Sequence, residues 1–187
     1  MHKFNNPNFL HNLGVVLFMA AIAFVLIAAR KATASPADAD NTFAMKAASG
    51  GMSEVKLGQL AAEKGTNPAV KQFGERMVSD HSKANDELKS VASQNNMTLP
   101  TDVSKTDAAV YERLSKLSGT EFDKAYAREM VKDHEQDIAE FQKESTTGKN
   151  PAVKEFASKT LPTLQSHLQE ARQMQKAVMS SSSSAGM

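Results

Sequence analysis

The chain has 187 residues, of which 41% are hydrophobic and 6% aromatic, and it contains neither cysteine nor tryptophan. Its length allows one domain with a buried core plus a terminal extension. The lack of cysteine excludes disulfides, zinc–thiolate sites and iron–sulfur clusters. The residues that remain plentiful (Ala, Lys, Glu, Gln, Leu and Met) favour an all-α fold.

The N-terminal segment carries an export signal. Gly14–Ala29 is an unbroken apolar run, and the small residues Ala32-Thr33-Ala34 follow it at the spacing of a cleavage site. This pattern predicts a signal peptide over 1–34, cleaved after Ala34. An uncleaved membrane anchor is the alternative, because Arg30 and Lys31 follow the run. In both cases we expect an exported protein of the periplasm or outer envelope. If uncleaved, this segment anchors it to the inner membrane, which is the only membrane contact expected.

The charge of the remaining chain argues against a nucleic-acid partner. Residues 1–34 hold three of the 22 basic residues and none of the 21 acidic ones, so the remainder has 19 basic and 21 acidic residues, a net charge of −2. It contains no basic run or cluster. Nucleic-acid binding usually requires such a surface and is therefore not expected.

Apolar residues spaced three and four apart predict four long helices and one short one. Asn67-Pro68 and Asn150-Pro151 are typical helix starts, and Thr120 with Asp123 predicts a capping box. Outside the helical region, 42–179, we expect a polar linker at 35–41 and a disordered Ser-rich tail at 180–187. The predicted helices are 43–64, 67–94, 105–117, 121 to about 145–149, and 150–178.

Connection lengths predict the topology. Tight turns join the first long helix to the second and the third to the fourth, so each pair is expected to be an antiparallel hairpin. The connection between the second and third contains the short helix and is long enough to run the length of a bundle. The second and third long helices are then parallel, which is the ferritin-like four-helix arrangement. A simple up-down bundle is the alternative.

Two segments repeat the same residues. FGERMVSDH at 73–81 and YAREMVKDH at 126–134 share an aromatic residue, Met, Val, Asp and His at a spacing of 53. In each segment Met precedes His by four residues, so both side chains lie on one helix face. A second short repeat, NPAVK, occurs at 67–71 and 150–154.

Each long helix carries one ionisable residue on its apolar face. Polar groups inside a bundle are costly unless they find partners, so these four residues are expected to meet in one layer. Three imidazoles and a carboxylate suit a transition metal ion such as copper, zinc or iron. The predicted metal ligands are Glu54, His81, His134 and His167, with Met77, Met130 and Asp137 as secondary candidates. The two methionines would favour Cu(I).

Neighbouring residues limit the alternatives. Asp80 and Asp133 each precede a histidine by one residue and are expected outside the metal's own ligand set. Val78 and Val131 stand three residues before His81 and His134, where di-iron bundle proteins have Glu. No hydrolase or phosphate-loop pattern is present. We therefore expect a metal-binding protein for storage, buffering or stress protection, and lean against an enzyme.

Two further interpretations remain open. The four polar residues could serve only to fix helix packing in a non-enzymatic structural or interaction protein of the envelope. A metal-dependent oxidoreductase is the weaker alternative, because it requires an open coordination position. The sequence does not settle the oligomeric state.

The residues from about Phe43 to Met174 resemble an uncharacterised family of exported bacterial proteins. The likeness rests on EVKLGQLAAEKGTNPAVKQFGERMVSDHSKANDEL, LSGTEFDKAYAREMVKDHE and LPTLQSHLQEA, which contain Glu54, His81, His134 and His167. Members are often labelled predicted outer membrane protein, a domain of unknown function. The resemblance implies a ferritin-like four-helix fold and export, and no established activity. Related exported helical families rich in Met and His suggest copper or silver handling by analogy.

Overall fold

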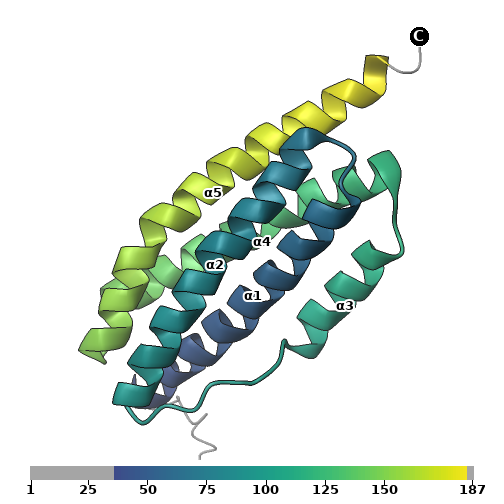
Figure 1. Ribbon diagram of the computed structural model, residues 1–187. Coiled ribbons are helices and arrows are strands. Elements are labelled where there is room, and N and C mark those ends of the chain that lie inside the picture. The colour runs from purple at the N-terminus through teal and green to yellow at the C-terminus, as the bar shows by residue number, and fades with distance from the viewer. Residues whose placement is uncertain (1–35, 185–187) are drawn as a thin grey trace, which may run out of the picture. The chain divides into compact units, whose positions relative to one another are not determined.

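The computed structural model describes residues 36–184, which form five α-helices (Figure 1). Predictions that concern residues 1–35, namely the signal peptide and its cleavage site, lie outside the described residues. None of the described helices is both long and apolar enough to cross a membrane. The helices are α1 (Pro36–Lys64), α2 (Pro68–Gln94), α3 (Lys105–Ser115), α4 (Gly119–Thr147) and α5 (Pro151–Ser184).

The long helices form two antiparallel hairpins, α1–α2 and α4–α5, that pack together (Figure 1). In the four-helix arrangement α1 packs against α4, and α2 packs against α5. The short helix α3 lies in the connection that runs back along the bundle, in contact with α1 and α4. Because of this return, α2 and α4 run in the same direction. The predicted ferritin-like connectivity, with its short extra helix, is confirmed.

The helix ends differ from the prediction in two places. Residues 36–41 were expected in a linker but are the first turns of α1, and Ser180–Ser184 were expected in a disordered tail but continue α5. Asp40 explains the first difference. Its side chain is 2% exposed and accepts hydrogen bonds from the backbone N–H groups of Lys149 and Asn150, which tie the start of α1 to the other hairpin.

Asp123 makes the equivalent contact at the other end of the bundle. The predicted capping box is wrong, because Asp123 is 2% exposed and does not cap its own helix. Its carboxylate instead accepts hydrogen bonds from the backbone N–H groups of Thr66 and Asn67, at 3.0 and 2.8 Å. Asn67 in turn caps α2 by accepting from the backbone N–H of Ala69. Each hairpin turn is thus held by an aspartate of the opposite hairpin.

Buried apolar side chains form two clusters along the bundle. One contains Leu57, Met77, Met130 and Met174, and the other contains Phe43, Leu88, Phe141 and Leu164. On every long helix the predicted polar residue lies in sequence between these two sets. A single polar layer therefore separates the two halves of the core. It contains Glu54 of α1, His81 of α2, His134 of α4 and His167 of α5.

Candidate metal centre

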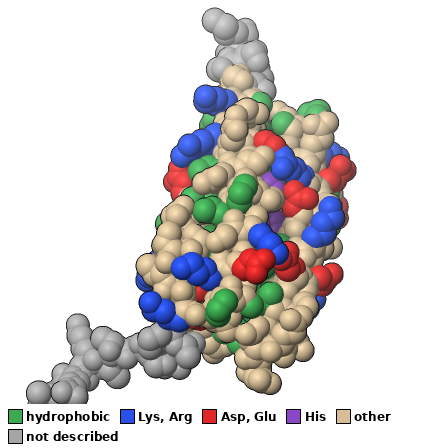
Figure 2. Space-filling view, turned by 90° about the vertical axis from the view of Figure 1, so that its left-hand side faces the viewer, with side chains coloured by type: hydrophobic (Ala, Val, Ile, Leu, Met, Phe, Trp, Pro, Cys, Tyr) green, Lys and Arg blue, Asp and Glu red, His purple; other side chains and the backbone are tan. Residues whose placement is uncertain are grey.

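The four polar residues of the layer are all buried. Glu54 and His134 are 0% exposed, His167 is 1% exposed and His81 is 6% exposed. One small patch of histidine surface, coloured purple, is visible on the face of the molecule that Figure 2 shows. The layer is thus enclosed by the bundle and comes close to solvent at one point.

Three of the four residues converge on one point. His81, His134 and His167 each offer a ring nitrogen, and these three nitrogens lie within 4.8 Å of one another. Their ring centroids are 5.4 to 5.9 Å apart. Nitrogens bound to one tetrahedral zinc ion at its usual bond lengths would lie about 3.3 Å apart. A small inward movement of the three rings is enough to reach that geometry.

Hydrogen bonds to the backbone and to a carboxylate set the tautomers of two rings. Nδ1 of His134 lies 2.9 Å from the carbonyl oxygen of Met130, so Nδ1 carries the proton. Nε2 of His167 lies 3.0 Å from Oδ2 of Asp80, to which it donates. The opposite nitrogen of each ring then holds a lone pair. Nε2 of His81, Nε2 of His134 and Nδ1 of His167 are buried without a hydrogen-bond partner among the described residues.

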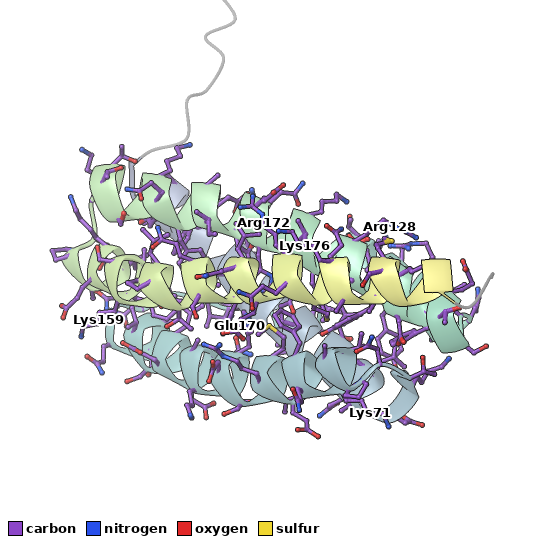
Figure 3. The ribbon with its side chains drawn as sticks, turned by 90° about the horizontal axis from the view of Figure 1, so that it is seen from above. Lys71, Arg128, Lys159, Glu170, Arg172 and Lys176 are labelled. Carbon is purple, nitrogen blue, oxygen red and sulfur yellow. The ribbon has the colours of Figure 1, made fainter. Side chains whose placement is uncertain are left out.

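Asp80 belongs to a polar network that reaches the surface between α2 and α5. Arg76 donates to Asp80 at 3.2 Å and also pairs with Glu170 of α5. Figure 3 places Glu170 on the side of α5 that faces α2. Burial raises the pKa of Asp80, but hydrogen bonds from His167 and Arg76 outweigh it and hold that pKa below its ordinary value. Asp80 is therefore an ionised carboxylate that orients His167, an arrangement common behind metal-bound histidines.

Burial keeps the imidazoles neutral. Removal from water is the main cause that lowers the pKa of His81 to about 3 and that of His134 to about 4, and the neighbouring histidines lower both further. Burial likewise lowers the pKa of His167, although Asp80 opposes that shift. Near neutral pH all three rings are therefore uncharged, which is the form that binds metal ions.

Glu54 occupies the layer but is not part of the converging cluster. Burial, followed by the nearby Asp133 carboxyl, raises the pKa of Glu54 well above its ordinary value. Both of its carboxyl oxygens lack a hydrogen-bond partner among the described residues, and so does the hydroxyl of Tyr126. Its place in the metal's ligand set stays a prediction.

The secondary candidates lie around the triad formed by His81, His134 and His167. Met77 and Met130 are fully buried in the apolar cluster on one side of the layer, and the Met130 carbonyl holds His134. Asp137 lines a small cavity on the other side, next to His81. Their direct coordination of the ion stays a prediction. Spacing along the helices identified all three residues, since each lies three or four positions from a histidine.

Sequence reasoning missed the groups that come from other helices. Asp80 was expected outside the metal's ligand set, and it lies there, but its contact with His167 of another helix was not anticipated. The pairing of Arg76 with Glu170 and the cavity beside His81 were not anticipated. Spacing along one helix gives no sign of such contacts between helices.

The comparisons with known proteins agree with this fold and offer no activity. No curated protein matches the chain. The crystal structure of a DUF305 fragment from Deinococcus radiodurans is similar, with a TM-score of 0.63 and 14% sequence identity over 75% of this chain and 95% of that one. This likeness shows the fold alone. A family model described as domain of unknown function (DUF4142) matches residues 27–174. The chain therefore belongs to the DUF4142 family.

Proposed function

We propose that this protein binds one transition metal ion at His81, His134 and His167. Two observations carry the proposal: ring nitrogens of three buried histidines lie within 4.8 Å of one another, and each of these rings has a buried nitrogen without a hydrogen-bond partner among the described residues. A buried polar group without a partner costs about 1–3 kcal/mol. Three such groups pointing to one place are the arrangement expected of a site that a ligand completes.

The chemistry of the donor atoms suits copper, zinc or iron. Neutral imidazoles bind borderline divalent ions, and buried thioethers near the site would favour Cu(I). Asp80 and the Met130 carbonyl supply the outer hydrogen bonds that metal-bound histidines usually have. Glu54 is the proposed source of negative charge, because a cation nearby would favour loss of its proton.

The role that fits such a site is storage, buffering or stress protection in the cell envelope. This part of the proposal is supported by the apolar N-terminal segment, whose composition is typical of an export signal. A bound ion would be enclosed by four helices and shielded from solvent. Such shielding suits holding an ion more than turning over a substrate.

Metal analysis of the full chain, purified without a His tag, tests the proposal. We expect about one zinc or copper ion per chain after loading, and a loss of affinity of more than about 100-fold in His134→Gln. Ser53→Ala, a nearby buried polar position on α1, is the matched control and should bind normally. Because His2 and His11 are present in every variant, any metal they hold cancels in the comparison.

A purely structural role is the competing explanation, and the same variants decide between the two. If the histidines only fix packing, His81→Gln and His134→Gln change the unfolding temperature while metal stoichiometry stays unchanged. That result would overturn the proposal. Detection of metal in the wild type that persists in both variants would place the ion elsewhere and overturn it equally.

A further inference from the structure

The two hairpins are related by an internal correspondence of 83 residues. Asp40 corresponds to Asp123, and both hold the turn of the opposite hairpin by accepting backbone N–H groups. NPAVK at 67–71 corresponds to NPAVK at 150–154. The correspondence pairs α1 with α4 and α2 with α5. It differs from the 53-residue spacing of the Met–His segments, which compares α2 with α4.

The correspondence assigns a counterpart to each residue of the triad. His134 corresponds to Gly51, His167 to Ala84 and His81 to Leu164. These three counterparts lie together and line a cavity of about 20 Å³. Phe156 also lines the cavity, and its counterpart Phe73 packs edge-on against two rings of the triad. The cavity therefore lies at the position that this correspondence relates to the metal site.

Small residues create this space. Gly51 leaves room for Asn85, because a Cβ at 51 would lie 2.1 Å from Oδ1 of Asn85 and the end of that side chain would have to move. The Gly50-Gly51 pair does not interrupt α1. The cavity is lined by four polar side chains, from His81, Asn85, Asp137 and Thr160.

His81 borders the cavity and also belongs to the triad. Its Nε2 is enclosed without a partner, and Nδ1 is not among the enclosed unpartnered atoms. Because His81 lines the cavity, Nδ1 is the nitrogen that we assign to a molecule bound there. The other two triad rings each have a protein group that fixes the second nitrogen. His81 has no such group among the described residues, which leaves its tautomer unset.

We propose that the cavity is a binding site for one water molecule that accepts a hydrogen bond from Nδ1 of His81. A space of more than about 10–15 Å³ with two to four polar partners can hold one water, and this cavity meets both conditions. The hydroxyl of Thr160 donates to the Phe156 carbonyl at 2.8 Å, so its oxygen faces a bound water as an acceptor. Burial also raises the pKa of Asp137 well above its ordinary value, which favours the protonated carboxyl, a hydrogen-bond donor.

This water gives His81 the outer hydrogen bond that Asp80 gives His167. The inference rests on the proposed metal site for its effect on affinity, but it also makes a prediction for the metal-free protein. With Nδ1 donating to the water, Nε2 keeps its lone pair for the ion. Metal-free His81 is therefore expected to be the Nδ1–H tautomer, the less common form of free histidine.

Two variants and two measurements test the inference. Ala84→Val fills the cavity, and Thr160→Val removes one polar partner at constant shape. Nitrogen-15 NMR of the metal-free full chain reports the His81 tautomer, and competition with a chelator reports zinc affinity. We expect Ala84→Val to shift the tautomer and weaken zinc binding about tenfold, with a smaller change in Thr160→Val. Ser158→Ala, which loses a comparable hydroxyl bond on the exposed face of α5, is the control.

An empty packing defect would behave differently. Filling it with Ala84→Val would then raise stability and leave both the tautomer and zinc affinity unchanged, which would overturn the inference. If Ala84→Val fails to fold, the test rests on Thr160→Val. An unchanged His81 tautomer in that variant is then sufficient to overturn the inference. If the wild type binds no metal, the proposed function fails while the tautomer measurement still decides the cavity.

Discussion

Two sets of buried polar residues in this bundle differ in how well they are satisfied. Asp40 and Asp123 are both 2% exposed, and each accepts backbone hydrogen bonds from the opposite hairpin. The histidines of the polar layer are also buried, but each presents one ring nitrogen without a hydrogen-bond partner among the described residues. Burial alone therefore does not distinguish structural polar residues from functional ones. Missing hydrogen-bond partners do distinguish the two sets.

The difference follows from what each set contacts. The aspartates meet the first N–H groups of a helix start, which need acceptors in every folded molecule. The histidines meet one another, and the lone pairs of His134 and His167 cannot form a hydrogen bond with each other. The first set should therefore control stability and the second should control ligand binding.

Removing an aspartate tests the structural half of this comparison and should have the largest effect on stability. Asp123→Ala leaves the N–H groups of Thr66 and Asn67 without their acceptor, so we expect a loss of about 2–4 kcal/mol in the free energy of unfolding. Urea denaturation measures it. Zinc affinity of the folded fraction should stay unchanged. A large loss of zinc affinity at constant stability would contradict the division into residues that control stability and residues that control binding.

Removing the support of a histidine should affect binding and spare stability. Asp80→Asn weakens the acceptor that orients His167, so metal affinity is expected to fall by about 10–100-fold. Isothermal titration with zinc measures the change. Asp86→Asn, an exposed acid of the same helix paired with Lys89, is the control. Equal affinity in Asp80→Asn and the control would remove Asp80 from the site.

Acid should destabilise the metal-free protein through the histidines. The pKa values of His81 and His134 are lowered from 6.5 to about 3 and about 4, so between roughly pH 6.5 and 4 the unfolded chain binds protons that the folded chain does not. Stability is therefore full above pH 6.5 and is lost as the pH falls through this window.

Thermal unfolding of metal-free protein at pH 7 and pH 5 measures this loss. Glu54 and Asp137 act in the opposite direction, because their pKa values are raised and their contribution is lost as pH rises. Replacing His134 by Gln should reduce the fall between the two pH values. An identical fall in that variant would show that other groups cause it.

The smallest effect is expected at Glu54. Burial raises the pKa of Glu54 well above its ordinary value, which favours the neutral carboxyl, so Glu54→Gln should leave metal-free stability nearly unchanged. Zinc affinity should fall by a few fold, about 1 kcal/mol or less, and one fewer proton should be released on binding. Titration in buffers of different ionisation enthalpy counts the protons. A loss as large as that of His134→Gln would make Glu54 a direct ligand.

The polar layer could be predicted because it depends on helix periodicity. His81 and His134 lie at similar depths in parallel helices, and the long connection with its short helix indicates that direction. These facts predict that the four polar residues meet; the structure brings the three histidines together and leaves Glu54 outside their cluster. Helix ends were harder to predict. Asp40 extends α1 through a contact 109 residues away, and no local pattern in 36–41 reveals it.

The orientation of the side chains in the polar layer could not be predicted from their spacing in the sequence. Which nitrogen of His167 faces inward depends on Asp80, and Gly51 beside the cavity lies against Asn85. Both are contacts between helices. Periodicity places a side chain on a face and does not fix its neighbours.

The distribution of the triad between the hairpins has a consequence for how long an ion stays bound. His81 belongs to the α1–α2 hairpin, and His134 and His167 belong to the α4–α5 hairpin. An ion bound by all three histidines would link one hairpin to the other. Its release then requires the hairpins to part, so the lifetime of the complex is tied to the opening rate of the bundle. The dissociation rate of the ion would then be set by the rate at which the bundle opens.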